Sequence, residues 1–145
     1  MRRNLVRALA AIAISGCATE PVTPAGKLPP ITNPAEAGEV VLIRPRAFIA
    51  DDTSLYINVN QDDIAPIRSG QHTRLKLPAG EHRVAIRCYS SLSGWRETAI
   101  TQRVAAGQAA YLAIAPHKDC VSVEPVSESE GRKLLSRTVF KSVLH

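Results

Sequence analysis

Short apolar runs separated by turn residues fill the stretch from residue 39 to residue 126, and this spacing limits the fold more than any other feature. Apolar side chains recur at every second residue, as at Leu55, Ile57 and Val59, which is typical of a strand with one buried face. Residues 40–43 are all apolar, which indicates a strand covered on both faces. The pattern predicts a mainly β domain, an antiparallel β-sandwich of about six or seven strands.

Two tight hairpins are expected within this domain. In the first, Gly80 supplies the positive φ that the turn requires, and Leu75 lies opposite Val84, so that the apolar faces of the two strands coincide. The second pairs residues 98–104 with residues 109–115 across a similar turn. Both turns are expected to join neighbouring strands of one sheet.

A short C-terminal helix follows the last strand. Ser127 and Glu130 form a capping-box pattern, which predicts a helix to about residue 136 with Leu134 and Leu135 against the sheet. The residues after it are expected to be loose.

The first sixteen residues have the parts of an export signal. Arg2, Arg3 and Arg7 give a basic start, and residues 5–14 are mostly apolar. A membrane span needs roughly twenty apolar residues, so this stretch is too short to remain as a transmembrane helix. We expect it to be removed.

The signal ends in Ile14, Ser15, Gly16 and Cys17, and this ending resembles the bacterial lipobox. The resemblance implies cleavage between Gly16 and Cys17 and acylation of Cys17. Residue Ala18 stands where an inner-membrane retention signal would have Asp, which implies the outer membrane, facing the periplasm. An ordinary signal peptide with a chance cysteine, and retention in the inner membrane, remain as alternatives.

Residues 18–38 contain five prolines and few bulky apolar side chains, which is typical of an extended tether. The chain therefore divides into four parts: a signal peptide (1–16), the lipidated cysteine and tether (17–38), the β-sandwich (39–126), and a short helix with a loose tail (127–145).

The charge of the mature chain argues against nucleic acid as a partner. Three of the 18 basic residues lie in the signal, so 15 basic residues remain against 13 acidic ones. A nucleic-acid-binding domain would carry a marked basic patch. We therefore expect no nucleic-acid partner.

Cys88 and Cys120 remain after the lipid-bearing cysteine is set aside. A disulfide between them would close a loop of about 33 residues and contribute roughly 3–4 kcal/mol. Strand alternation places Cys88 on the face of Ile86, whereas it points Cys120 away from the face of Val121. A disulfide and two separate thiols both remain open.

The order of these pieces resembles a domain-of-unknown-function family of small bacterial outer-membrane lipoproteins with a PEGA- or transthyretin-like β-sandwich. The matching stretches are the ending Ser15, Gly16 and Cys17, residues 38–45, 55–60 and 77–82, the turn Ala106 and Gly107 before Tyr111, and residues 128–132. The resemblance implies a fold and a cellular location; this family has no established activity.

Candidate chemistry in the sequence is sparse. The pairs Asp51 with Asp52 and Asp62 with Asp63 sit where turns favour Asp, and neither fits a calcium loop. A Cys88 and His82 pair would lie about 20 Å apart along one strand, too far for a nucleophile and its base. We expect a non-enzymatic protein without metal or cofactor.

Trp95, followed by Arg96, is the candidate contact for a partner, although the sequence favours a Trp folded inward over the core. The sequence thus favours a membrane-anchored structural or protein-interaction module of the envelope, held by acyl chains and contacting an envelope protein. A small-ligand or lipid-binding lipoprotein with a cleft between its sheets is the second hypothesis.

Overall fold

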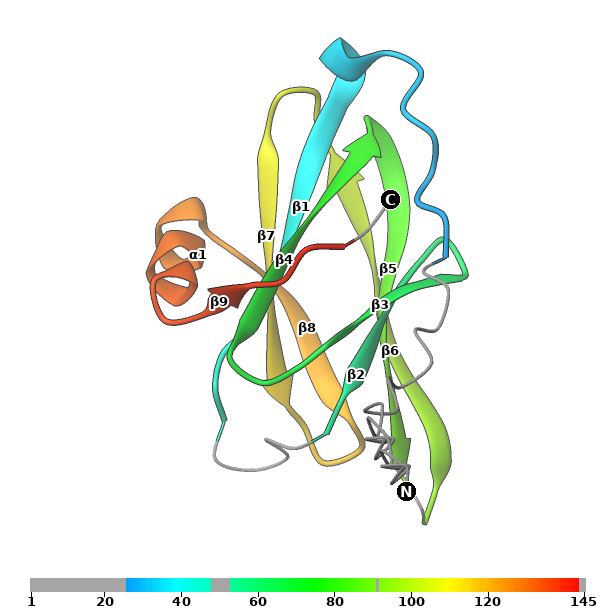
Figure 1. Ribbon diagram of the computed structural model, residues 1–145, viewed down its shortest axis with the longest axis vertical. Helices are drawn as coiled ribbons and strands as arrows, with labels where there is room; N and C mark the ends of the chain where they lie inside the picture. The colour runs from blue at the N-terminus through cyan, green and yellow to red at the C-terminus, as the bar shows by residue number, and fades with distance from the viewer. Residues whose placement is uncertain (1–25, 48–52, 91, 144–145) are drawn as a thin grey trace, which may run out of the picture.

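Two β-sheets face each other across one core, with a short helix on the outer side of one of them (Figure 1). The computed structural model describes residues 26–47, 53–90 and 92–143; the expected signal, Gly16, Cys17 and the pair Asp51 and Asp52 lie outside these residues. The mainly β architecture and the C-terminal helix confirm the predicted fold class.

The five-stranded sheet has the order β8-β7-β1-β4-β9, and the four-stranded sheet has the order β3-β2-β5-β6. The elements are η1 (Pro34–Glu36), β1 (Ala37–Arg44), β2 (Leu55–Val59), β3 (Asp62–Ile67), β4 (Gln71–Pro78), β5 (Gly80–Ser90), β6 (Gly94–Val104), β7 (Ala109–Pro116), β8 (Val121–Val126), α1 (Glu128–Leu135) and β9 (Val139–Phe140).

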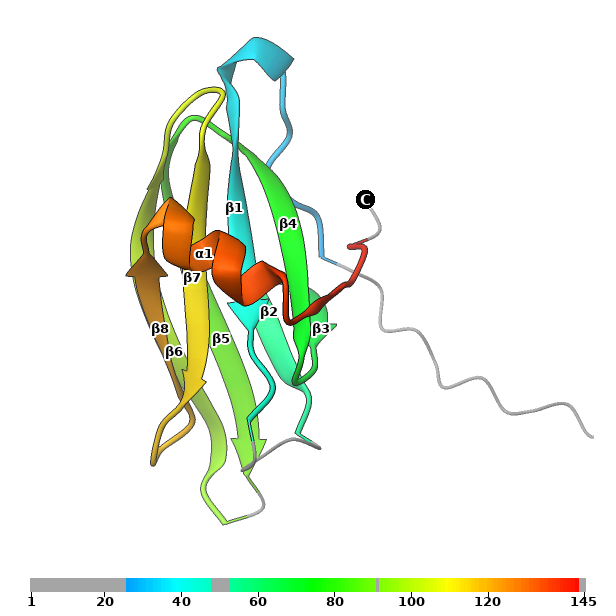
Figure 2. The ribbon, with the colours of Figure 1, turned by 90° about the vertical axis from the view of Figure 1, so that its left-hand side faces the viewer.

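Strand β1 is buried on both faces, as its unbroken apolar run predicts. It lies in the middle of its sheet, antiparallel to β4 and parallel to β7. Val40 and Leu42 pack into the core between the sheets, whereas Val41 and Ile43 pack beneath the helix. Figure 2 shows α1 lying across β7 and β1 on this outer face.

The inward faces of both sheets fill the core with aliphatic side chains. Its fully buried large members include Leu42, Ile57, Ile64, Ile67, Leu75, Leu77, Ile86, Leu112 and Ile114. Burying an aliphatic side chain of this size contributes about 1.5–3 kcal/mol, so this core is the main source of the domain's stability.

The first expected hairpin is wrong, because β4 and β5 belong to different sheets. Strand β4 pairs with β1 and β9, while β5 pairs with β2 and β6. The chain crosses between the sheets at Ala79, whose N–H donates to the Glu36 carbonyl over 2.8 Å. Leu75 and Val84 do face the same core, but from opposite sheets. Coinciding apolar faces satisfy either arrangement, so the pattern could not distinguish them.

The second expected hairpin is wrong for the same reason. Strand β6 pairs with β5, and β7 pairs with β1 and β8. The tight connections within one sheet are β2 to β3, β5 to β6 and β7 to β8. Two pairs, β1 with β7 and β4 with β9, are parallel, so the sandwich is not purely antiparallel.

A disulfide between Cys88 and Cys120 joins the two sheets at one end, with 6.0 Å between the Cα atoms. Cys88 lies on β5, and Cys120 lies just before β8 begins at Val121. Because Cys120 precedes the strand, strand alternation does not fix its direction. The Cys120 side chain can therefore point toward Cys88 although the alternation of β8 would direct it away from the core.

The helix α1 begins as its sequence predicts. Ser127 is the N-cap, and its side chain accepts a hydrogen bond from the Glu130 N–H over 3.2 Å. Leu134 and Leu135 pack against the small cluster of Val41, Ile43 and Tyr111 on the outer face of the sheet.

Both ends of the described chain pack more closely than the sequence indicated. The Gly26 N–H donates to the Asp63 carbonyl over 2.7 Å, and Leu28 packs against the core, although both fall within the stretch expected as tether. After α1, the short strand β9 pairs with β4, and Val143 is buried in the core, where a loose tail was expected. Isolated apolar residues gave too little periodicity to signal this packing.

We predict that the double change Cys88→Ala, Cys120→Ala lowers the free energy of unfolding by about 3–4 kcal/mol, because the bond closes a loop between the two sheets. For a domain of this size the melting temperature should fall on the order of 10–20 °C. Reductant should lower the melting temperature of the parent protein and leave that of the double variant unchanged. An equal effect of reductant on both proteins would contradict a stabilising bond.

We predict that Gly131→Ala destabilises the protein although Ala is the better helix former. The added Cβ would lie 2.5 Å from Cγ and 2.8 Å from Cβ of Tyr111, which is buried beneath the helix. Overpacking typically costs about 1–3 kcal/mol, against a gain in helix propensity of about 1 kcal/mol. Chemical unfolding measures the difference; Lys133→Ala, an exposed change in the same helix, should be near neutral. A more stable Gly131→Ala variant would contradict this packing.

Candidate binding surface

A cluster of aromatic side chains lies exposed on the outer face of the four-stranded sheet. The Trp95 ring packs edge-on against Tyr56 at 5.5 Å and against Tyr89 at 5.4 Å between centroids. The guanidinium carbon of Arg87 lies 4.7 Å from the centroid of the Trp95 ring, within the range of a cation–π contact. Together with Leu92, these residues are named the aromatic surface below.

Strand register brings these side chains together. Tyr56 of β2 lies opposite Arg87 of β5, and Tyr89 lies opposite Trp95 of β6. Residues of equal parity on a strand share a face, so Arg87 and Tyr89 both point outward while Cys88 points into the core. The aromatic surface therefore results from the pairing of β2, β5 and β6.

Trp95 is 51% exposed and Tyr89 59% exposed, while Leu92 in the β5–β6 connection is 97% exposed. Trp95 therefore does not cap the core, so the orientation favoured from the sequence is wrong. Solvent-exposed aromatic and apolar side chains gathered in one patch are characteristic of contact surfaces. Arg96 alternates with Trp95 and points to the other side of the strand, toward a pocket at the end of the sandwich.

Ion pairs hold the flank of the aromatic surface. Arg87 donates to the Asp63 carboxylate over 2.6 Å, and Arg83 pairs with Glu97. Burial raises the pKa of Asp63, but hydrogen bonds from Asn58 and Arg87 and the positive charge of Arg87 together hold it below its ordinary value. Asp63 is therefore ionised and keeps Arg87 beneath the Trp95 ring.

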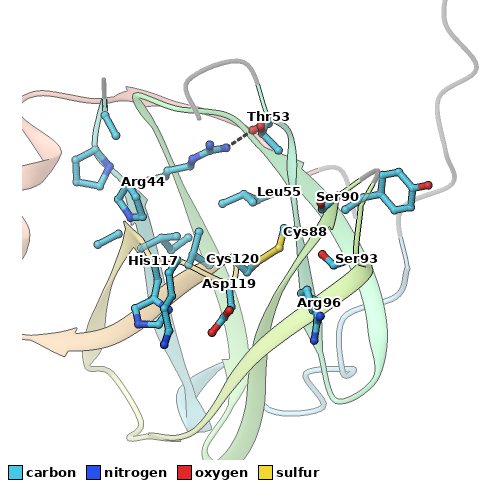
Figure 3. Close-up of a pocket in the computed structure, with 18 residues that line it drawn as sticks. Arg44, Thr53, Leu55, Cys88, Ser90, Ser93, Arg96, His117, Asp119 and Cys120 are labelled. Atoms are coloured by element: carbon cyan, nitrogen blue, oxygen red, sulfur yellow. Dashed lines mark hydrogen bonds between the residues drawn. A yellow bond between two sulfur atoms is a disulfide. The ribbon is translucent and has the colours of Figure 1, made fainter. Parts of the chain in front are cut away.

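A pocket of about 310 Å³ opens between the sheets at the end that carries the disulfide (Figure 3). Its lining includes Cys88 and Cys120 together with Arg96, His117 and Asp119. The volume is at the low end of those that take small ligands.

Arg44 also lines this pocket, and its side chain is engaged within the domain. One of its terminal nitrogens, Nη1, donates to the carbonyl of Thr53 over 2.6 Å and to the carbonyl of Ile67 over 2.9 Å. These hydrogen bonds connect the end of β1 with the segment just before β2 and with the end of β3.

His82, which was considered from the sequence, and His72 both form hydrogen bonds within the domain. His82 is buried; its Nε2 donates to the Pro78 carbonyl over 2.8 Å, and its Nδ1 accepts from the Asn60 amide over 3.0 Å. His72 Nδ1 lies 2.8 Å from the Thr138 hydroxyl, and burial together with the charge of Arg74 lowers its pKa. Both imidazoles thus hold neighbouring backbone segments in place.

Among the described residues, no three His, Cys, Asp or Glu side chains gather closely enough to bind a metal ion. In the same part of the chain, no helix has the length and apolarity needed to cross a membrane. The paired Asp62 and Asp63 lie on β3.

Four members of the aromatic surface were not recognised from the sequence: Tyr56, Arg87, Tyr89 and Leu92. From the sequence alone, the Ser- and Gly-containing residues 89–97 indicate a loop, whereas β5 extends to Ser90 and β6 begins at Gly94. The Ser- and Gly-containing residues 90–94 between two alternating stretches were the available signal for a long hairpin.

We predict that the Asp63 carboxyl of the parent protein titrates below its ordinary value of 3.8 and that Arg87→Gln raises this pKa. A lowered pKa in the folded state stabilises the fold at pH values above the unfolded pKa, and that contribution is lost as the pH falls through the folded value. Carboxyl carbon NMR measures both pKa values; Arg103→Gln, on the exposed part of β6, is the control. An Asp63 pKa at or above 3.8 in the parent protein would contradict the assignment.

Comparisons of this chain with protein-family models, with curated proteins and with solved structures give no match.

Proposed function

We propose that this chain is an exported lipoprotein, anchored in the outer membrane through acyl chains on Cys17 and facing the periplasm. Its β-sandwich serves as a non-enzymatic interaction module of the cell envelope. The proposed location rests on the signal sequence that ends in Ser15, Gly16 and Cys17. Several acyl chains, at about 0.8 kcal/mol per buried methylene, make such an anchor effectively permanent.

The disulfide between Cys88 and Cys120 supports an exported location. Disulfides persist in oxidising compartments such as the periplasm and are rare in the cytosol. Here the bond links the two sheets at one end of the core, where it contributes to stability as in other secreted domains.

The observation that carries the interaction role is the exposure of β6. This strand of eleven residues pairs with β5 on one side, lies at the edge of the four-stranded sheet and carries Trp95. An edge strand offers unpaired backbone groups to which a partner segment can add as a further strand. An envelope protein that binds by strand addition at β6 is therefore the proposed protein partner.

A photo-crosslinking side chain at Thr101, exposed on β6, tests this partner in intact cells. We expect one envelope protein to be recovered in a fixed ratio, since strand addition fixes the register of the partner. The same group at Lys133, exposed on α1, is the matched control. Equal recovery of the same proteins from both positions would contradict a partner at β6.

A second function, the binding of a small ligand or lipid, is favoured by the pocket beside the disulfide. It lies between the sheets, as that hypothesis requires, and combines the apolar Leu55 and Ile114 with Arg96 and His117. A melting-temperature increase with purified envelope lipids or glycans, lost on Ile114→Trp, would favour it. No shift with either class would favour the interaction module.

We predict that Cys17→Ser removes the protein from the outer-membrane fraction, because the residue loses the thiol that receives the lipid. The parent protein should remain in the outer-membrane fraction after washing with high salt, since acyl chains hold it by the hydrophobic effect and not by charge. The variant Cys88→Ala, Cys120→Ala retains Cys17 and should remain membrane-bound. Retention of the Cys17→Ser protein in the outer-membrane fraction would contradict the anchor.

A further inference from the structure

Exposed apolar side chains concentrate at one end of the domain. Of the five large apolar side chains exposed in the described residues, three lie in the β5–β6 hairpin: Tyr89, Leu92 and Trp95. Figures 1 and 2 show this hairpin projecting beyond the other strands at its end of the molecule. Three members of the aromatic surface therefore lie on a projecting hairpin.

The described chain begins close to the aromatic surface. The Gly26 N–H is bound to the Asp63 carbonyl, the Asp63 carboxylate is paired with Arg87, and Arg87 lies against Trp95. In Figure 1, the first described residues lie on the side of the four-stranded sheet, opposite α1. A short series of contacts thus connects the start of the described chain with the aromatic surface.

The covalent distance to the anchor is short. Nine Cα-to-Cα steps separate Cys17 from Gly26, and at no more than about 3.6 Å per residue they span about 30 Å at most. A domain of roughly 100 residues has a radius of gyration of about 13 Å, so this reach is similar to the diameter of the domain. The bilayer surface therefore lies within reach of the side from which the chain departs.

We propose that the aromatic surface docks into the headgroup layer of the membrane that holds the anchor. This inference rests on the proposed acylation of Cys17. Trp and Tyr side chains favour the interface between lipid and water, where the ring is buried and its polar group stays hydrated. Leu92 at the tip of the hairpin enters the apolar boundary, and Tyr89 and Trp95 lie in the headgroup layer behind it.

Basic side chains near the β5–β6 hairpin are compatible with docking at the headgroup layer. Arg96 and Lys118 are exposed at the same end of the sandwich, where the phosphate groups of the headgroups would lie. Long basic side chains bury their methylenes along the apolar boundary and keep their charge in the headgroup layer. Asp119 is an acidic neighbour that lines the pocket between the sheets (Figure 3), and the carboxylates of Asp63 and Glu97 beside the aromatic surface are paired with Arg87 and Arg83.

Because the proposed acyl anchor already holds the domain at the membrane, the aromatic surface can dock through a weak contact. A tether of a few residues holds a surface at an effective concentration in the millimolar range, so docking too weak to occur in solution becomes populated. A projecting tip with one Leu and two aromatic rings suits a deformable lipid layer, whereas a protein partner would need a site that receives the tip. The docked domain keeps the edge of β6 within the periplasm, available to its protein partner.

Trp95 is the single Trp of the chain, so its fluorescence reports directly on this contact. The acylated mature protein is reconstituted into vesicles of phosphatidylethanolamine and phosphatidylglycerol, with and without brominated acyl chains. We expect a blue-shifted Trp95 emission in the vesicles and quenching by the brominated lipid. Leu92→Ser should lower the docking equilibrium constant about tenfold, because its side chain no longer enters the apolar layer.

Val139→Ser is the matched control, because Val139 is equally an exposed apolar residue but lies on β9, outside the aromatic surface. It should leave the quenching unchanged. Equal loss of quenching in the Leu92 and Val139 variants would overturn the proposed docking surface, as would quenching unaffected by Leu92→Ser.

Flotation of the same vesicles separates this inference from the anchor. Protein that floats with the vesicles while Trp95 stays unquenched overturns docking and leaves the acyl anchor intact; the aromatic surface is then free for a protein or a glycan. Purified mature protein whose Cys17 carries no lipid overturns both proposals. Quenching that requires the acyl chains and Leu92 supports both.

Discussion

The structure depends on the apolar contact between the two sheets. Neither sheet is stable alone, because the inner face of each consists of aliphatic side chains such as Leu42, Ile57 and Ile86 that must be removed from water. Strand β1 adds a second layer, since its alternate residues Val41 and Ile43 are covered by α1. The disulfide between the sheets then fixes one end of this contact.

The sequence predicted the elements of this structure better than their connections. Period-two alternation located the strands, the unbroken run of β1 indicated burial on both faces, and Ser127 marked the start of the helix. The pairing partners were not predictable in the same way. An apolar stripe must face the core, but residues such as Leu75 and Val84 satisfy this both as neighbours in one sheet and as opposite walls of the sandwich.

The residues of the aromatic surface were likewise only partly predictable from local sequence patterns. Trp95 and Arg96 were identified from the sequence because an aromatic residue in a polar stretch is conspicuous. Tyr56 and Arg87 are distant in sequence and reach Trp95 through the pairing of three strands, so no local pattern relates them. Similarly, Gly131 looked unfavourable for a helix, and only the contact with Tyr111 explains why a residue without a side chain is needed there.

The proposed anchor, the edge strand and the aromatic surface are the basis of our proposal that the domain is held close to a membrane and is open to a partner, and this proposal depends on Cys17. The most direct test is the intact mass, with N-terminal fragmentation, of the protein extracted from the membranes of the cells that make it. The account predicts a chain that begins at residue 17 and carries acyl groups on Cys17, with the mass of one disulfide between Cys88 and Cys120. A chain whose Cys17 is unmodified, or from which residues 1–16 have not been removed, would contradict it.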